Sequence, residues 1–230
     1  PQMEFRNCDN LKIEGILLRD TPNWTLKIVG STGVHIDNIK EIGWIMNSDG
    51  MDFICCRDVL VENTFQRNYD DNVTIKAFNA TPEYIASHTN TDGSYSDGAI
   101  WMVAGLRDFE VCNYEIRNCV FWADKAHNML VGPEARGIAF RNIRFHDNIV
   151  LENRQNGRIT GVKDIKSFDE KEILLFTQAG KLVIKGEQLH VKQLDLEKGE
   201  VDLEGKVDSL TYLSKNTDNR DESLFRRMFR

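Results

Sequence analysis

The sequence predicts an all-β protein of two parts, a parallel β-solenoid followed by a small β-rich domain. In the first part, short runs alternate apolar and polar residues and close on Gly or Asn: Leu11–Gly15, Val34–Asn38, Val59–Asn63, Phe109–Asn113 and Ile138–Asn142. The first three runs begin 23 and 25 residues apart. A period in this range, with β-branched residues in the runs, is typical of a solenoid in which each repeat adds one coil.

A second set of runs predicts another strand in each coil: Trp24–Val29, Asp52–Cys56 and Val73–Ala77. Strands of successive coils hydrogen-bond at a spacing of roughly 4.8 Å, so residues one period apart become neighbours. Asp49 and Asp70 lie 21 residues apart. We therefore expect Asp49 to lie beside the Asp70–Asp71 pair.

The composition fits one or two soluble domains, with 230 residues, a net charge of -7 and 41% hydrophobic residues. Residues 1–146 hold 14 Lys and Arg against 20 Asp and Glu, which argues against nucleic acid and suits a carboxylate-rich cleft. No apolar run approaches the roughly 18 residues of a membrane span. Since the chain opens at Pro1 without an initiator Met, localisation is left unknown.

The five cysteines form no C-x-x-C pair, and their odd number supports neither a disulfide framework nor a zinc site. We expect buried thiols inside the solenoid. These residues are Cys8, Cys55, Cys56, Cys112 and Cys119.

The pattern changes near residues 147–160, which predicts a boundary between domains 1–146 and 147–230. About six short strands are expected in the second domain: Arg158–Val162, Ile173–Thr177, Lys181–Lys185, Leu189–Leu194, Glu200–Glu204 and Val207–Leu213. Gly180, Gly186, Gly199 and Gly205 are interpreted as turn residues. The chain closes on a flexible, basic and amphipathic tail, Ser223–Arg230, which is expected to be a frayed terminus or to dock on an anionic surface or a coat partner.

The acids of Asn47–Asp52 and Asp70–Asp71 suggest glycosidic chemistry. Inverting hydrolysis needs a protonated carboxyl for the leaving oxygen and a carboxylate that activates water. Clustered acids raise the pKa of one member, which keeps it protonated. The alternative is that Asp residues at coil corners only cap turns.

Four segments resemble motifs of glycoside hydrolase family 28, the polygalacturonases: Pro22–Leu26, Asn47–Asp52, Tyr69–Asp71 and Ala126–Gly132. The resemblance covers about residues 4–146 and implies a truncated right-handed parallel β-helix that acts on a polysaccharide without metal or cofactor. It implies that Asp70 is the general acid, that Asp49 and Asp71 activate water, and that His127 orients or tunes them. The chain departs from the family at Tyr69, at the glycines missing around His127, in a polar insertion at 79–98, and in lacking the later substrate-binding coil.

Three further residues are candidates for substrate binding: Asp52, Trp101 and Trp122. Aromatic rings can stack on the apolar faces of sugars, although both tryptophans could equally belong to the solenoid core.

The second part resembles the YabP family of bacterial sporulation proteins in five segments: Glu152–Val162, Ser167–Glu170, Gly180–Leu189, Leu194–Gly199 and Glu204–Lys206. This resemblance implies a non-enzymatic protein of spore formation with a spore-coat partner. Two hypotheses follow for the whole chain: a polysaccharide hydrolase joined to a spore-assembly module, or a structural sporulation protein whose carboxylates are relics. Whether the join is natural is open at this stage.

Overall fold

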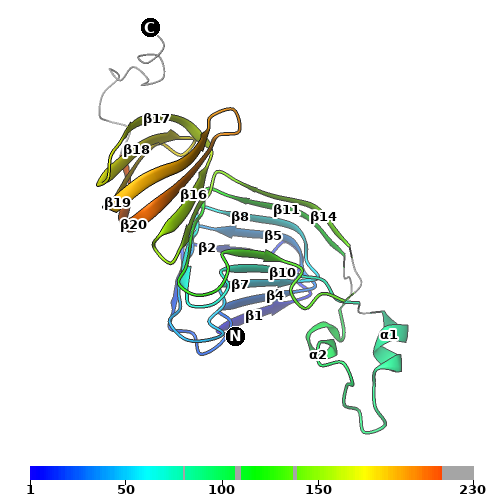
Figure 1. Cartoon of the computed structure of the whole chain (residues 1–230). Helices are drawn as coiled ribbons and strands as arrows, with labels where there is room; N and C mark the ends of the chain where they lie inside the picture. The colour runs from blue at the N-terminus through cyan, green and yellow to red at the C-terminus, as the bar shows by residue number, and fades with distance from the viewer. Residues whose placement is uncertain (80, 107–109, 137–138, 214–230) are drawn as a thin grey trace.

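The computed structural model describes residues 1–79, 81–106, 110–136 and 139–213, and it is nearly all β (Figure 1). Strands of successive coils stack in parallel in three sheets, which we call A, B and C. Sheet A contains β1 (Met3–Arg6), β4 (Leu26–Val29), β7 (Met51–Ile54), β10 (Val73–Lys76) and β13 (Met129–Val131). Sheet B contains β2 (Lys12–Glu14), β5 (Thr32–Asp37), β8 (Arg57–Glu62), β11 (Val111–Arg117) and β14 (Phe140–His146).

Sheet C supplies the third strand of each coil: β3 (Leu17–Arg19), β6 (Lys40–Ile42), β9 (Phe65–Asn68), β12 (Val120–Ala123) and β15 (Ile149–Glu152). The predicted solenoid is confirmed, and so are the predicted strands of sheets A and B, although Phe109 and Ile138 lie outside the described residues. These third strands of the coils were not predicted. All five cysteines are free thiols, and four of them are buried, as expected.

The pairing register gives the length of each coil. Met3 pairs with Leu26, Leu26 with Met51 and Met51 with Val73, so the first coils differ by only a few residues. Val73 then pairs with Met129, because an insertion carries the short helices α1 (Pro82–Ser87) and α2 (Ile100–Val103). Met102 and Val103 pack on Val29 and Ile54 of sheet A. The insertion therefore continues past the predicted residues 79–98, and its second helix packs back onto sheet A.

The remaining strands are antiparallel and continue sheet C: β16 (Asn156–Thr160), β17 (Val162–Phe168), β18 (Glu172–Thr177), β19 (Lys181–Asp195) and β20 (Glu200–Leu213). The expectation of about six short strands is corrected here, because β19 and β20 each join two predicted strands. Gly186 and Gly205 lie inside these strands rather than in turns. The β19–β20 ladder shifts register beside Gly186, where the chain bulges instead of ending the strand.

One sheet spans both parts of the molecule. β15 pairs in parallel with β12 and antiparallel with β16, so the antiparallel strands cover the edge of sheet C at the end of the coils. Pairing changes from parallel to antiparallel between Glu152 and Asn156, whereas the domain boundary at 146 and 147 stays a prediction. The predicted basic tail lies outside the described residues. Across the described part of the chain, no helix has the length and apolar character to cross a membrane.

Candidate active site

The predicted acids meet where the strands of sheet A begin. The Gly50 N–H donates to the Asp71 carbonyl at 2.8 Å, and the Asn72 N–H donates to the His127 carbonyl at 2.9 Å. These bonds extend the β7–β10–β13 ladder by one residue, so that Asp49, Asp71 and His127 occupy one row across three coils. The expected proximity of Asp49 to the Asp70–Asp71 pair is thereby confirmed.

The Asp70 carboxylate is held by backbone donors. Its Oδ2 accepts a hydrogen bond from the Asn47 N–H at 2.9 Å, and its Oδ1 accepts one from the Asp71 N–H at 3.1 Å. Asn47 has a φ of 60°, a left-handed conformation that Asn adopts more readily than most residues. The turn of one coil thus orients the half-buried acid of the next.

Asp71 and His127 form a second contact between coils. The Asp71 Oδ1 lies 3.0 Å from the His127 Nδ1 and also accepts the His127 N–H at 2.9 Å. The His127 side chain is 67% exposed, while that of Asp71 is 15% exposed. The carboxylate therefore fixes one ring nitrogen and leaves the rest of the imidazole accessible.

Asp49 lies deeper than the other two acids and is almost fully buried. Its pKa is raised, first by burial and then by the negative charges of Asp52 and Asp70. Asp49 consequently favours the protonated form, so the cluster contains a carboxyl that tends to keep its proton.

Asp52 lies behind these acids with no exposed surface. Its Oδ1 accepts the Thr74 hydroxyl at 2.6 Å and lies 3.1 Å from the Lys76 Nζ, which also pairs with Glu134 at 3.2 Å. Burial raises the pKa of Asp52 even though Lys76 opposes the shift. The structure therefore places this predicted substrate-binding residue in a buried ion pair.

The two predicted tryptophans lie on different sheets. Trp101, on α2, lies with its ring 4.2 Å from the Lys27 Nζ, and Lys27 is the ladder neighbour of Asp52 in sheet A. Trp122 belongs to β12 of sheet C and packs 4.3 Å from the Arg67 guanidinium. These rings do not form one continuous surface, and their binding role stays a prediction.

Sequence reasoning missed an exposed apolar turn next to the acids. Trp44, Ile45 and Met46 are 49%, 48% and 72% exposed, and they directly precede Asn47. The Trp44 ring lies 4.7 Å from the Arg67 guanidinium, which Asp124 holds at 3.0 Å. The available signal was a run of three large apolar residues immediately before an acidic turn.

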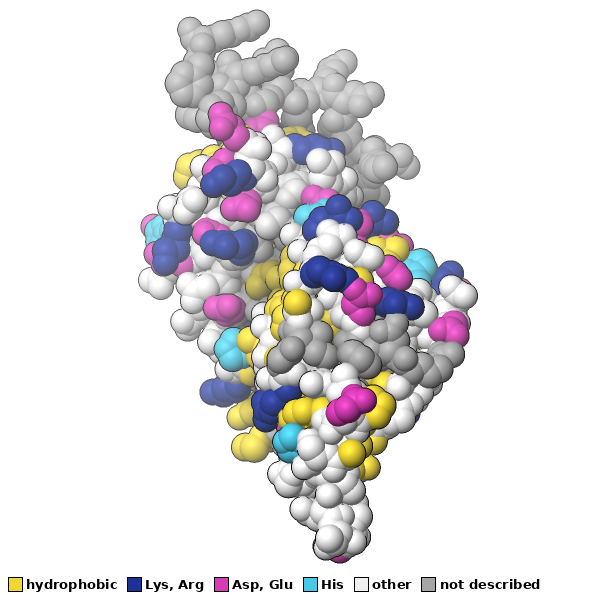
Figure 2. Space-filling view, turned by 90° about the vertical axis from the view of Figure 1, so that its right-hand side faces the viewer, with side chains coloured by type: hydrophobic (Ala, Val, Ile, Leu, Met, Phe, Trp, Pro, Cys, Tyr) yellow, Lys and Arg dark blue, Asp and Glu magenta, His cyan; other side chains and the backbone are white. Residues whose placement is uncertain are grey.

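A cavity of about 600 Å³ joins the two parts of the molecule beside this cluster. His127, Met129 and Val150 line it from the last coil, and Arg158 and Lys192 line it from the antiparallel strands. Figure 2 shows one face of the molecule, with a band of hydrophobic side chains below the antiparallel part. Above this band, side chains of both charges are interspersed. The exposed imidazole of His127 therefore lines a cavity that apolar side chains also line.

Comparison with known proteins separates the chain into two stretches. Residues 1–99 match the family model described as Glycosyl hydrolases family 28, and residues 144–219 match that of the YabP family. Spore protein YabP from Bacillus subtilis (strain 168) is 38% identical over 85 residues, which cover 37% of this chain and 84% of that protein. Both resemblances are confirmed. The glycosyl hydrolase match includes Asp49, Asp52, Asp70 and Asp71 and ends before His127.

Proposed function

The chain belongs to the YabP family, and because its coils also match glycosyl hydrolases family 28, we propose that it is a spore-associated protein whose β-helix hydrolyses a polysaccharide. The observation that carries the proposal is the row formed by Asp49, Asp71 and His127, with Asp70 alongside it. Three carboxylates and an imidazole at one corner of stacked coils supply an acid, a base and an orienting group.

The likeness to glycosyl hydrolases family 28 suggests the roles of the acids, and their contacts are compatible with those roles. Asp70 is half-buried and serves as general acid, because the donor must reach the glycosidic oxygen. Asp71, oriented by His127, activates the water for single-displacement inversion. Asp49 lies deeper than these two acids, where burial favours its protonated form, and it assists water activation as the deprotonated carboxylate.

The polysaccharide would cross the cluster from the exposed turn to the cavity. Trp44 offers an aromatic face for a sugar ring on one side of the acids, and Arg158 and Lys192 offer cations on the other. Asp202 and Glu204 pair with these two cations, so a uronic acid residue would compete with carboxylates already present. The proposed substrate is an acidic or neutral glycan.

Release of reducing ends from polygalacturonate and from neutral glycans tests the proposal. Asp70→Asn should lower kcat by about 10²–10⁴-fold, as expected for loss of a general acid. Asp20→Asn is the matched control, because Asp20 is an exposed turn residue that pairs only with its neighbour Arg19 among its described contacts. An aryl glycoside with a good leaving group should restore activity to Asp70→Asn, since its departure needs little protonation.

Two outcomes would contradict this function. No release from any glycan would remove the enzyme hypothesis. Release that Asp70→Asn leaves unchanged would remove the assignment of the site.

A second candidate, a non-enzymatic role in spore assembly with a coat-protein partner, is favoured by the family match of residues 144–219. A fluorescent fusion of the full chain, produced in sporulating Bacillus subtilis, should concentrate on the developing spore. Uniform fluorescence throughout the mother cell would argue against a spore role for the chain.

A further inference from the structure

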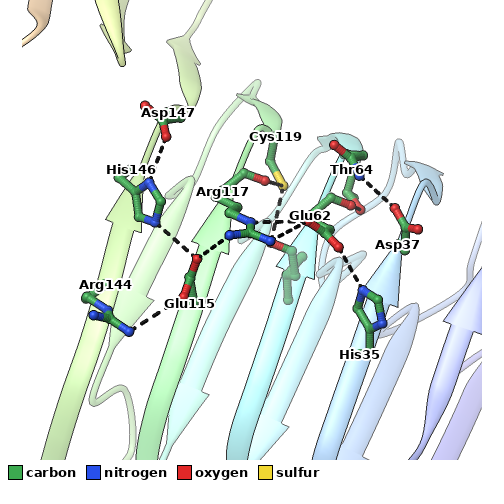
Figure 3. Close-up of polar contacts among 12 residues, drawn as sticks. His35, Asp37, Glu62, Thr64, Glu115, Arg117, Cys119, Arg144, His146 and Asp147 are labelled. Carbon is green, nitrogen blue, oxygen red and sulfur yellow. Dashed lines mark hydrogen bonds and ion pairs between the residues drawn. The ribbon is translucent and has the colours of Figure 1, made fainter. Parts of the chain in front are cut away.

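The outer face of sheet B brings a histidine and two carboxylates together, on a different sheet from the acids of the candidate active site (Figure 3). His35 and Asp37 are two residues apart on β5 and therefore project from the same face. Glu62 on β8 pairs directly with Asp37 across the ladder. Two adjacent coils thus contribute three side chains to one point on the surface.

The ligand atoms of these side chains converge. One ligand atom of each of His35, Asp37 and Glu62 lies within 4.8 Å of the others, and the His35 Nε2 is 2.9 Å from the Glu62 Oε1. Zinc binds imidazole nitrogen and carboxylate oxygen at about 2.0–2.2 Å, so small rotations of these half-buried side chains would allow all three to reach a common ion. Three protein ligands plus water complete four-coordinate geometry.

Neighbouring donors already hold the opposite oxygen of each carboxylate. Arg117 donates through Nε and a terminal nitrogen to the Glu62 Oε2 at 3.1 and 3.0 Å, and the Asn63 amide donates to the Asp37 Oδ1 at 2.8 Å. Contacts of this kind orient the ligands of metal sites. They leave the Glu62 Oε1 and the Asp37 Oδ2 for an ion.

The local charge suits a divalent cation. Arg117 divides its charge between Glu62 and Glu115, which it contacts at 2.7 Å. Lys12 pairs with Glu14 at 2.5 Å. Asp37 and Glu62 therefore keep an excess of negative charge that these cations do not neutralise.

We propose that His35, Asp37 and Glu62 bind a divalent transition-metal cation of the zinc type, which joins the β5 and β8 coils. An imidazole with two carboxylates favours zinc-like ions over calcium or magnesium, which prefer ligand sets made entirely of oxygen. This proposal departs from the sequence-based expectation of no metal, because the Glu ligand lies a full coil away and forms no short motif.

His146 provides a matched comparison on the same sheet face. Its Nδ1 lies 2.8 Å from the Asp147 Oδ2, and its Nε2 lies 3.4 Å from the Glu115 Oε1. The two ring nitrogens point at different carboxylates, as Figure 3 shows, so they do not converge on one point. His146 has acidic neighbours without the geometry of a metal site.

Isothermal titration with Zn²⁺ tests the proposal on the full chain, after chelation and without a histidine tag. The protein should bind one equivalent, and His35→Gln should weaken the affinity at least tenfold, about the lower limit for loss of support at a metal site. His146→Gln should bind as the unchanged protein does. Co²⁺ should give visible absorption bands of a four-coordinate ion in the unchanged protein and lose them in His35→Gln.

His35 is partly exposed, so His35→Gln should fold, and circular dichroism would verify this. Asp37→Asn provides a second variant that keeps the shape of the side chain and should also lose the bound ion. The proposal is overturned if Zn²⁺ does not bind, if His35→Gln binds equally well, or if His146→Gln is the variant that loses binding.

Discussion

The parallel coils and the antiparallel strands build their interiors from different residues. Among the described residues of the coils, five charged side chains are buried: Lys27, Glu41, Asp49, Asp52 and Lys76. Among the described residues of the antiparallel strands, Thr177 is the buried polar side chain, and the core there consists of Ile, Leu and Val. The two parts share sheet C yet reach stability in different ways.

This difference bears on where function lies. A buried charge costs several kcal/mol unless partners compensate it, so charges persist inside proteins mostly where they are paired or used. The buried side-chain atoms without a hydrogen-bond partner in the described structure all belong to the coils, including the Glu41 Oε1 and the Asp52 Oδ2. The coils thus accept a cost that the described antiparallel strands avoid.

The largest loss of stability is expected when the buried Asp52–Lys76 ion pair is broken. Asp52→Ala leaves Lys76 buried with only Glu134 as its described acidic partner, and it should lower the free energy of unfolding by about 3–5 kcal/mol. Urea denaturation at neutral pH measures the change. Adding Lys76→Met should recover much of the loss, because a buried ion pair can often be replaced by apolar residues at little net cost.

If Asp52→Ala lowered the free energy of unfolding by less than about 1 kcal/mol, this pair would be no stronger than an ordinary surface ion pair. The contrast between the two interiors would then disappear at this position.

The next largest effect is expected on the pH dependence of the free energy of unfolding, which a buried acid of the coils causes. Glu41 is fully buried, and burial raises its pKa from 4.5 to about 8. Between these values the folded state keeps a proton that the unfolded state releases, so the contribution of Glu41 to stability is fully present below 4.5 and is lost as pH rises towards 8. Each pH unit in this window is worth up to about 1.4 kcal/mol.

Glu41→Gln should flatten this slope in urea titrations between pH 5 and 8, because the amide carries no titrating proton. Gln66 donates to the Glu41 carboxyl, and a glutamine oxygen can accept the same bond. Asp49, whose pKa is also raised, should preserve part of the slope. An unchanged slope in Glu41→Gln would show that this carboxyl does not hold the proton.

The sequence predicted sheets A and B because apolar residues alternate along them and face the core. It missed the third strands of the coils, and for two of them, β6 and β9, the same buried groups give a physical reason. Glu41 of β6 and Gln66 of β9 point inward and stack on each other, so the inward positions of these strands carry polar side chains. A pattern search that equates inward with apolar cannot find such strands.

The acids of the candidate site were predictable because the period of the coils places them, and His127 came from its motif. Trp44 was missed because a large apolar residue is usually assigned to a core, whereas here it lies exposed in a turn. Gly186 and Gly205 were misplaced because the sequence cannot distinguish a turn glycine from one that permits close approach of two strands.

Gly205 offers a backbone test in the antiparallel part. It has a φ of 117°, and a Cβ there would clash with the Gln188 carbonyl oxygen of the neighbouring strand. Gly205→Ala should destabilise the protein by about 1–3 kcal/mol, the usual cost of strain of this kind. Gly98→Ala is the control, since open space surrounds Gly98. Equal denaturation midpoints for the two variants would contradict the role given to Gly205.

The smallest effect is expected at an ion pair of the antiparallel part. Arg158 makes two hydrogen bonds to Asp202, at 2.7 and 2.8 Å, but its side chain is 59% exposed. Solvent screens such pairs, so Arg158→Gln should cost about 0–1 kcal/mol, and the cost should shrink further at high salt. Urea denaturation at two salt concentrations measures both. If Arg158→Gln cost as much as Asp52→Ala, pairing rather than burial would set the strength of these contacts, and the difference between the two interiors would lose its energetic basis.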